Sequence, residues 1–337
     1  MKRSRLLAWG VLALMVASFP SCKSDSAGPG DSGGLAAEDF MDAAGEALES
    51  IGGALMENQA AVTVEVLSNY ITGVTAQPAI APLAAIARIP TEALGSTFVF
   101  DTDLYEYVVD PTLTGAPEDG VRFLLYTVNE STFEIVLPLS QIGHIDIRDL
   151  TVGDNLDARH TVVIGGATML TFTVAGTASE AGADLTTSGT VSVGGTSAQF
   201  TFDVEVGPTG EHLVIDATSA TYRLQWDYVR ALYGVGPGSD AITLSESQSG
   251  GRVEFNVTWD AAFMGTGAVE FNDVIVADVS GSGGYPEVTP RAGSGLTEWD
   301  GLLLVEGYYE ILHLEAFLLG MTQFGLQNAG IDWYLYY

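Results

Sequence analysis

The sequence predicts a mainly β protein: a curved antiparallel meander sheet or a partly closed barrel, with an N-terminal helical segment and a buried C-terminal helix. Three observations support this prediction. Apolar and polar residues alternate through the middle of the chain, which is the period of a β-strand. Glycine-rich breaks interrupt the alternation at short intervals. The composition is 47% hydrophobic and 16% charged with 40 glycines, which provides enough apolar surface for a core and many turn positions.

The clearest strands lie between residues 168 and 260. In one of them Tyr222, Leu224, Trp226 and Tyr228 alternate with polar residues, so one face should be buried and the other wet. Turn-like breaks follow at residues 181–182, 194–195, 208–210, 236–238 and 250–251. Consecutive strands joined by short turns form a meander, and a sheet of this many strands must curl because strands twist. Further strands are expected in 97–109, 121–137 and 331–337.

The helical segment before the sheet is predicted from apolar residues at helical spacing, up to about Tyr70. A different, alternating pattern in 62–66 leaves a strand open at that point. Three prolines then mark a connector that ends at residue 90. The apolar positions of the helix are Phe40, Ala44, Leu48, Ile51 and Leu55, and the prolines are Pro78, Pro82 and Pro90.

The C-terminal helix is predicted over residues 302–326. Its apolar residues surround nearly the whole circumference, and its main polar stripe consists of Glu306, Glu310 and His313. A helix that is apolar on most sides is usually buried. We therefore expect it to lie against, or within, the concave face of the curved sheet.

The N-terminus carries an export signal. Lys2, Arg3 and Arg5 precede the apolar run 6–17, which is shorter than the ~20 residues a membrane-spanning helix needs. The run leads to Cys22, the only cysteine in the chain, and then to a Ser-, Gly- and Asp-rich stretch typical of a flexible linker. An ordinary signal peptide with an incidental thiol is the alternative. The domains expected are a signal peptide (1–21), a linker (22–35), a helical segment and connector (36–90) and an antiparallel β domain (91–337).

This N-terminus resembles the signal of bacterial lipoproteins, in which a lipobox ends at an acylated cysteine that becomes the first residue. Ser21 fits that pattern, whereas Phe19 and Pro20 depart from it. The resemblance implies that Cys22 is lipidated and anchors the protein in the cell envelope. Because Lys23 is not Asp, it implies the outer membrane, with the domain facing the periplasm or the cell surface.

The charge balance excludes one class of partner. The chain has 12 Lys plus Arg against 43 Asp plus Glu, and removing the signal peptide would take away three cations and no acid, leaving a net charge near −34. Without a basic surface to neutralise phosphates, we expect no nucleic-acid binding. The acidity fits a soluble surface, a high-salt habitat or divalent-cation binding.

No motif assigns a catalytic, cofactor-binding or metal-binding residue. The segment 30–34, GDSGG, is similar to the nucleophile segment of chymotrypsin-like proteases, but it lies in the linker and the His-Cys hallmark of that family is absent. The histidines are widely spaced, and the carboxylates of 146–157 are a calcium candidate without EF-hand spacing. The residues considered are His144, His160, His212, His313, Asp146, Asp149, Asp154, Asn155 and Asp157.

Three functional hypotheses follow. The first is a non-catalytic, lipid-anchored envelope protein, a binding or structural module whose concave face holds an apolar ligand or its own C-terminal helix. Its partners are the membrane, through the anchor, and an apolar ligand or an envelope protein. The second is an acidic surface module that binds proteins, glycans or Ca²⁺. The third is a hydrolase with a dispersed site of acidic residues and histidines.

Overall fold

The structure, a computed structural model, describes eight separate positions between 45 and 70 and most of residues 89–328. Within the second range it leaves out 130–131, 133, 154, 180–181, 194, 232–236, 248–250 and 283–284. The predicted signal peptide, Cys22, the linker and the predicted final strand 331–337 therefore lie outside the described residues.

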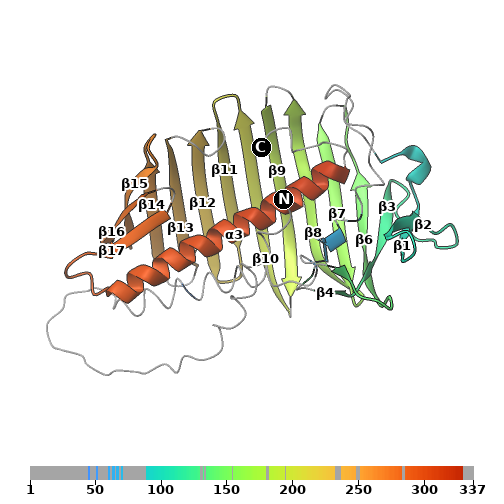
Figure 1. Cartoon of the computed structure of the whole chain (residues 1–337), viewed down its shortest axis with the longest axis horizontal. Coiled ribbons are helices and arrows are strands. Elements are labelled where there is room, and N and C mark those ends of the chain that lie inside the picture. Colours follow the sequence, from blue (N-terminus) through green and yellow to red (C-terminus); the bar gives the residue numbers. More distant parts are fainter. Residues whose placement is uncertain are drawn as a thin grey trace.

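One open, curved sheet forms the body of the described chain (Figure 1). Its fifteen strands lie in the order β17-β16-β15-β14-β13-β12-β11-β10-β9-β8-β7-β6-β3-β1-β2, and β4 pairs separately with β5. All neighbours in the large sheet are antiparallel except β1 and β3. The bounds of the strands before the long meander are β1 (Thr97–Asp101), β2 (Glu106–Val109), β3 (Gly120–Tyr126), β4 (Val128–Asn129) and β5 (Glu134–Ile135).

From β6 onward each strand pairs with the next one in sequence, as a meander requires. The predicted mainly β, antiparallel fold is thus confirmed, and the sheet is curved but not closed. The bounds of the meander strands are β6 (Gln141–Asp149), β7 (Leu156–Ile164), β8 (Ala167–Ser179), β9 (Gly182–Val193), β10 (Thr196–Gly207), β11 (Gly210–Thr218), β12 (Tyr222–Ala231), β13 (Gly238–Glu246), β14 (Arg252–Trp259), β15 (Met264–Phe271), β16 (Val274–Ser282) and β17 (Tyr285–Pro290).

The strand expected over 97–109 is instead a tight hairpin of β1 and β2. The Asp101 side chain makes the turn, because its Oδ1 accepts the backbone N–H groups of Asp103 at 2.8 Å and Leu104 at 3.0 Å. Tyr105 then takes a positive φ of 60°. A short side chain that hydrogen-bonds its own backbone is a strong turn former, and this outweighs the strand propensity of the flanking residues.

The C-terminal helix, α3 (Glu298–Asn328), is longer than the predicted 302–326. A capping box sets its start. The Thr297 Oγ1 accepts the N–H of Asp300 at 3.4 Å, and the Asp300 Oδ2 accepts the N–H of Thr297 at 2.5 Å. These bonds satisfy backbone donors that a helix N-terminus otherwise leaves unpaired.

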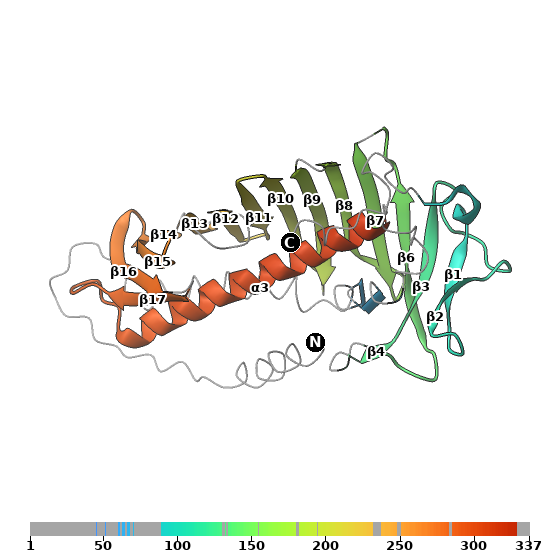
Figure 2. The same ribbon diagram turned by 45° about the horizontal axis from the view of Figure 1, so that its top comes forward.

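Helix α3 crosses the concave face of the sheet diagonally (Figures 1 and 2). It begins beside β17, where Gly301 approaches Val288, and reaches β8, where Gly325 approaches Val174. Its buried residues recur every three or four positions: Tyr308, Ile311, Leu314, Leu318, Met321 and Phe324. The exposed residues of α3 form one narrow stripe, which includes Leu302 at 56% exposure, Glu306 and His313, so the expected burial on most sides of the helix is confirmed.

The N-terminal helical segment also packs on the sheet. All eight described positions are helical, including Thr63, Val64 and Val66, so the strand alternative for 62–66 is wrong. Thr63, Val66 and Leu67 line a small cavity together with residues of β2, β3, β4 and β5. Tyr70 adds an edge-to-face contact with Phe100, with ring centroids 5.2 Å apart. None of the described helices has the length and apolar character needed to cross a bilayer.

The close approach of α3 to the sheet gives a testable prediction from two glycines of the same helix. A Cβ at Gly325 would lie 2.4 Å from Cγ2 of Val174, whereas a Cβ at Gly320 would meet no atom within 4 Å. We expect Gly325→Ala to lower the free energy of unfolding by about 1–2 kcal/mol through overpacking. Gly320→Ala, the matched control, should raise it by about 0.5–1 kcal/mol, because alanine is the better helix former. Urea denaturation measures both, and two changes of the same sign would contradict the packing.

Candidate functional site beneath the C-terminal helix

The concave face beneath α3 is apolar and aromatic, with a few polar groups set into it. Towards β17 the ring of Phe255 lies 5.3 Å from that of Tyr308, a residue of α3. Near the sheet centre the hydroxyls of Thr187 and Thr322 are 2.6 Å apart. Because buried polar groups are costly unless they are paired, the polar groups of this interface are the positions where it could carry function.

Asp240 is the most deeply buried carboxylate of this interface, at 1% exposure. Its Oδ2 accepts the indole N–H of Trp259 at 2.7 Å and the hydroxyl of Tyr308 at 3.4 Å. Its Oδ1 has no hydrogen-bond partner among the described residues. Burial raises the pKa of Asp240, and the hydrogen bond from Trp259 opposes that rise. The carboxyl therefore joins β13, β14 and α3 at one point.

Glu315 and Arg230 lie beside Asp240. The Arg230 guanidinium carbon is 4.4 Å from the centroid of the Tyr228 ring, a cation–π distance. Burial raises the pKa of Glu315 to about 7; nearby Arg230 lowers it, and Glu211 and Asp240 raise it further. Among the described residues of this cluster, Arg230 is the one cation near the carboxyl groups of Glu315, Asp240 and Glu211. Glu315 titrates near neutral pH.

His160 occupies the other end of the helix–sheet interface. It is fully buried and stacks on Phe172 with centroids 4.3 Å apart, while Phe324 of α3 lies 5.3 Å away. Neither ring nitrogen has a hydrogen-bond partner among the described residues. Burial lowers the pKa of His160 to about 3, so it is a neutral aromatic side chain of the core. It lies away from carboxylates and has no arrangement for acid–base catalysis.

His212 lies at a hollow of about 760 Å³ where β9, β10, β11 and β12 end, beside Glu205 and Arg230. Its Nε2 is 3.0 Å from an Oδ1 of Asp227, and its Nδ1 is 3.7 Å from Glu205. A histidine that activates a nucleophile directs one ring nitrogen at that nucleophile. Here both nitrogens are directed at carboxylates, so this arrangement supports an ionic contact better than the predicted alternative of hydrolysis.

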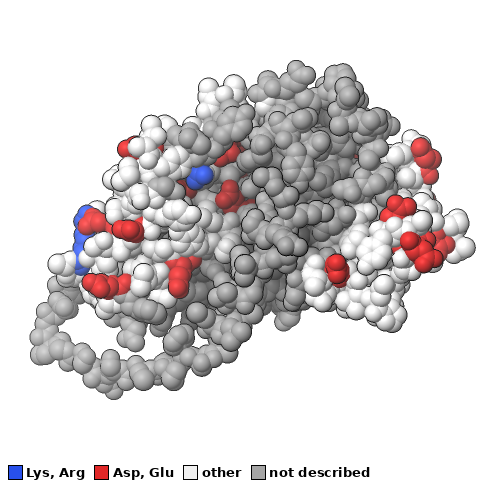
Figure 3. All heavy atoms as spheres, viewed as in Figure 1, with Lys and Arg blue, Asp and Glu red and all other residues white. Residues whose placement is uncertain are grey.

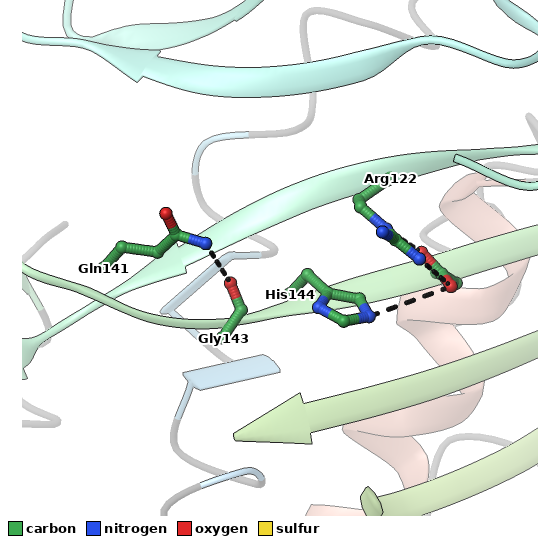
Figure 4. A network of polar contacts seen from close by, with 5 residues as sticks. Arg122, Gln141, Gly143 and His144 are labelled. Carbon is green, nitrogen blue, oxygen red and sulfur yellow. Dashed lines mark hydrogen bonds and ion pairs between the residues drawn. The ribbon is translucent and has the colours of Figure 1, made fainter. Parts of the chain in front are cut away.

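His144 and Asp146 form part of a polar network on the outer face (Figure 4). Arg122 binds Asp146 through two hydrogen bonds, of 2.6 and 2.8 Å, and His144 Nε2 lies 3.9 Å from the same carboxylate. Burial lowers the pKa of His144, with a further contribution from Arg122. Asp146, the first residue of the calcium candidate, is therefore engaged by an arginine.

The described calcium candidates other than Asp146 belong to no metal-binding group of acidic and histidine side chains. Asp149 accepts the backbone N–H of Thr151 at 3.0 Å, which is a turn contact. Asp154 lies outside the described residues. Among the described residues, no three or more histidine, cysteine or acidic side chains lie close enough to hold a metal ion.

Sequence reasoning missed the cluster of Asp240, Arg230 and Glu315, although one signal pointed to it. Asp240 occupies a buried position of its strand, in step with Ile242 and Leu244. A carboxylate on the apolar side of an alternating strand is unusual, and it marks a buried polar site. His313, which was part of the predicted polar stripe, is exposed on α3.

Comparisons with known proteins identify no similar protein. No family model, no curated protein and no solved structure matches this chain.

Proposed function

We propose that this chain is a non-catalytic, lipid-anchored protein of the bacterial cell envelope, with a structural or binding role. The sequence of the N-terminus supports the anchor at Cys22. The observation that carries the non-catalytic role is that α3 covers the concave face of the sheet, the place where an apolar ligand would bind. Two polar groups of that face, Asp240 and Thr187, make hydrogen bonds to Tyr308 and Thr322 of the helix.

The energetics favour α3 as the resident occupant. Seven large apolar side chains of α3 are buried: Tyr308, Ile311, Leu314, Leu318, Met321, Phe324 and Leu326. At roughly 1.5–3 kcal/mol for each buried side chain, displacing the helix would cost on the order of 10 kcal/mol before any ligand compensated. The concave face is therefore best assigned to the protein's own core, and the outer surface to external contacts.

Metabolic labelling tests the anchor. We expect radiolabelled palmitate to enter the wild-type chain and not the Cys22→Ser variant, because acylation needs the thiol. The wild-type protein should fractionate with membranes, and Cys22→Ser should become soluble, since the lipid supplies the membrane contact of an acidic protein. Circular dichroism of Cys22→Ser serves as the control for folding. If the wild-type protein incorporated no radiolabelled palmitate, the proposal would be contradicted.

Mass spectrometry of the detergent-purified protein tests the assignment of the concave face. We expect the acyl groups attached to Cys22 and no additional lipid at one molecule per chain. A lipid bound stoichiometrically, and retained by Cys22→Ser, would show instead that the concave face holds a ligand.

A further inference from the structure

The two edges of the open sheet differ in their ability to accept another strand. At β17 the backbone N–H of Arg291 donates to the carbonyl of Val276 in β16, at 2.9 Å. The backbone N–H groups of successive residues point alternately toward and away from the neighbouring strand. The N–H positions of residues 286, 288 and 290 therefore face away from β16. Two of these residues, Pro286 and Pro290, have no N–H. Edge prolines block strand addition, and β17 is therefore a protected edge.

The opposite edge, β2, has no proline within the strand, although Pro111 occupies the next outward position after Val109. The backbone N–H of Asp110 donates to the carbonyl of Thr97 at 2.9 Å, which turns Val108 and Glu106 toward β1. Tyr107 and Val109 consequently direct their N–H and C=O groups away from the sheet. No described residue pairs with these backbone groups, and β2 is the last strand in the sheet order. Val109 is 46% exposed and Tyr107 5%, so the edge offers the backbone donor and acceptor of Val109 to a partner most openly.

Apolar side chains surround this edge. Leu104 is 61% exposed, Tyr105 51%, Val109 46% and Leu113 37%. All four belong to β2 and the turns on either side of it. Edge strands that do not pair usually carry charges or proline; β2 carries one charge, Glu106, and its other exposed residue, Val109, is apolar. The combination of open backbone groups and apolar side chains is the pattern of a strand-addition site.

The charge around β2 indicates the chemistry of the partner. The stretch 89–121 contains seven acidic residues and no lysine or arginine: Glu92, Asp101, Asp103, Glu106, Asp110, Glu118 and Asp119. Of these, Asp119 is paired with Arg148. In Figure 3 acidic side chains gather at the β1–β2 end of the molecule, and no basic side chain is visible there. A second copy of this chain would bring the same acidic surface, whereas a basic segment would complement it.

We propose that the β2 edge binds a cationic, extended segment of another protein, which adds to the sheet as a sixteenth strand beside Tyr107 and Val109. The segment's backbone pairs with β2, its apolar side chains contact Leu104, Val109 and Leu113, and its Lys or Arg residues face the acidic rim. This interaction needs no membrane anchor, so it stands or fails independently of acylation at Cys22.

A binding assay on the full chain tests the site, with a fluorescent peptide of alternating lysine and valine as the probe. We expect binding that weakens as salt increases, and no binding of a glutamate–valine peptide of the same length. Val109→Pro removes one outward N–H without touching the β1–β2 ladder and should weaken binding at least about tenfold. Val109→Ile keeps the N–H and the apolar side chain, and should bind as the wild type does.

Melting temperatures of both variants confirm that each is folded. The proposal is overturned if Val109→Pro binds the cationic peptide as well as Val109→Ile does, or if the wild type does not bind it at millimolar concentration. It is also overturned if sedimentation shows a dimer that Val109→Pro dissociates, because the occupant would then be a second copy.

Discussion

Replacing Glu315 by glutamine is expected to stabilise the protein at pH 8 by up to about 3 kcal/mol and to leave its stability at pH 4 nearly unchanged. Burial raises the pKa of Glu315 from 4.5 to about 7. Between these values the folded chain holds a proton that the unfolded chain has released, so the free energy of unfolding decreases as the pH rises. Above pH 7 the full penalty, roughly 1.4 kcal/mol for each pH unit of the shift, is present.

Other groups titrate in the same range, so the difference between variants is the informative quantity. The raised pKa of Asp240 lowers stability as the pH rises, like that of Glu315, whereas the lowered pKa of His160 lowers stability as the pH falls. The His160 contribution should cancel when Glu315→Gln is compared with wild type, whereas Asp240 interacts electrostatically with Glu315, so its change adds to the gain at high pH. Chemical denaturation at pH 4, 6 and 8 measures the difference. Glu306→Gln, at an exposed position of α3, is the matched control and should show no comparable pH-dependent gain.

If the gain in the free energy of unfolding is larger at pH 8 than at pH 4 in Glu315→Gln and not in Glu306→Gln, the Glu315 carboxyl group is desolvated at the interface as described. The absence of a gain at pH 8 would mean that the Glu315 carboxylate is ionised in the folded protein without a penalty, because Arg230 compensates it fully.

The sheet could be predicted from the local sequence because the alternation of apolar and polar residues in each strand indicates which face is buried. In β12, Tyr222, Leu224, Trp226 and Tyr228 are all buried, as alternation requires. The turn positions were also predictable: three of the five glycine-containing breaks include the first residue of a strand, and the other two, 194–195 and 250–251, immediately precede β10 at Thr196 and β14 at Arg252. Local hydrogen bonding decides such features, and the residues concerned are close in sequence.

The interface between α3 and the sheet could be predicted only in outline. The pattern of 302–326 indicated burial, but an open sheet presents one face to a helix, and a narrow stripe on the opposite side, including Leu302, remains exposed. The contact of Tyr308 with Asp240 joins residues 68 positions apart. Nothing in the local sequence of either residue specifies the other, because the diagonal of α3 depends on the curvature of the whole sheet.

Truncating Leu318 to alanine is expected to lower the free energy of unfolding by about 2–5 kcal/mol, the usual cost of a cavity at a fully buried leucine. Leu318 has no exposed surface and lies in the middle of the buried side of α3. Leu302→Ala is the matched control, because the same change at a mostly exposed position of the same helix should alter stability by less than about 0.5 kcal/mol.

This pair of variants also tests whether α3 closes the concave face in solution. If the helix is docked, Leu318→Ala loses stability and binds more of an apolar dye such as anilinonaphthalene sulfonate, since a loosened helix exposes the aromatic face beneath it. If the helix were displaced in the native state, Leu318 would be as exposed as Leu302, and both variants would have wild-type stability. If Leu318→Ala and Leu302→Ala changed the free energy of unfolding equally, the concave face would be better explained as a ligand site. A much larger loss in Leu318→Ala would favour its role as part of the core.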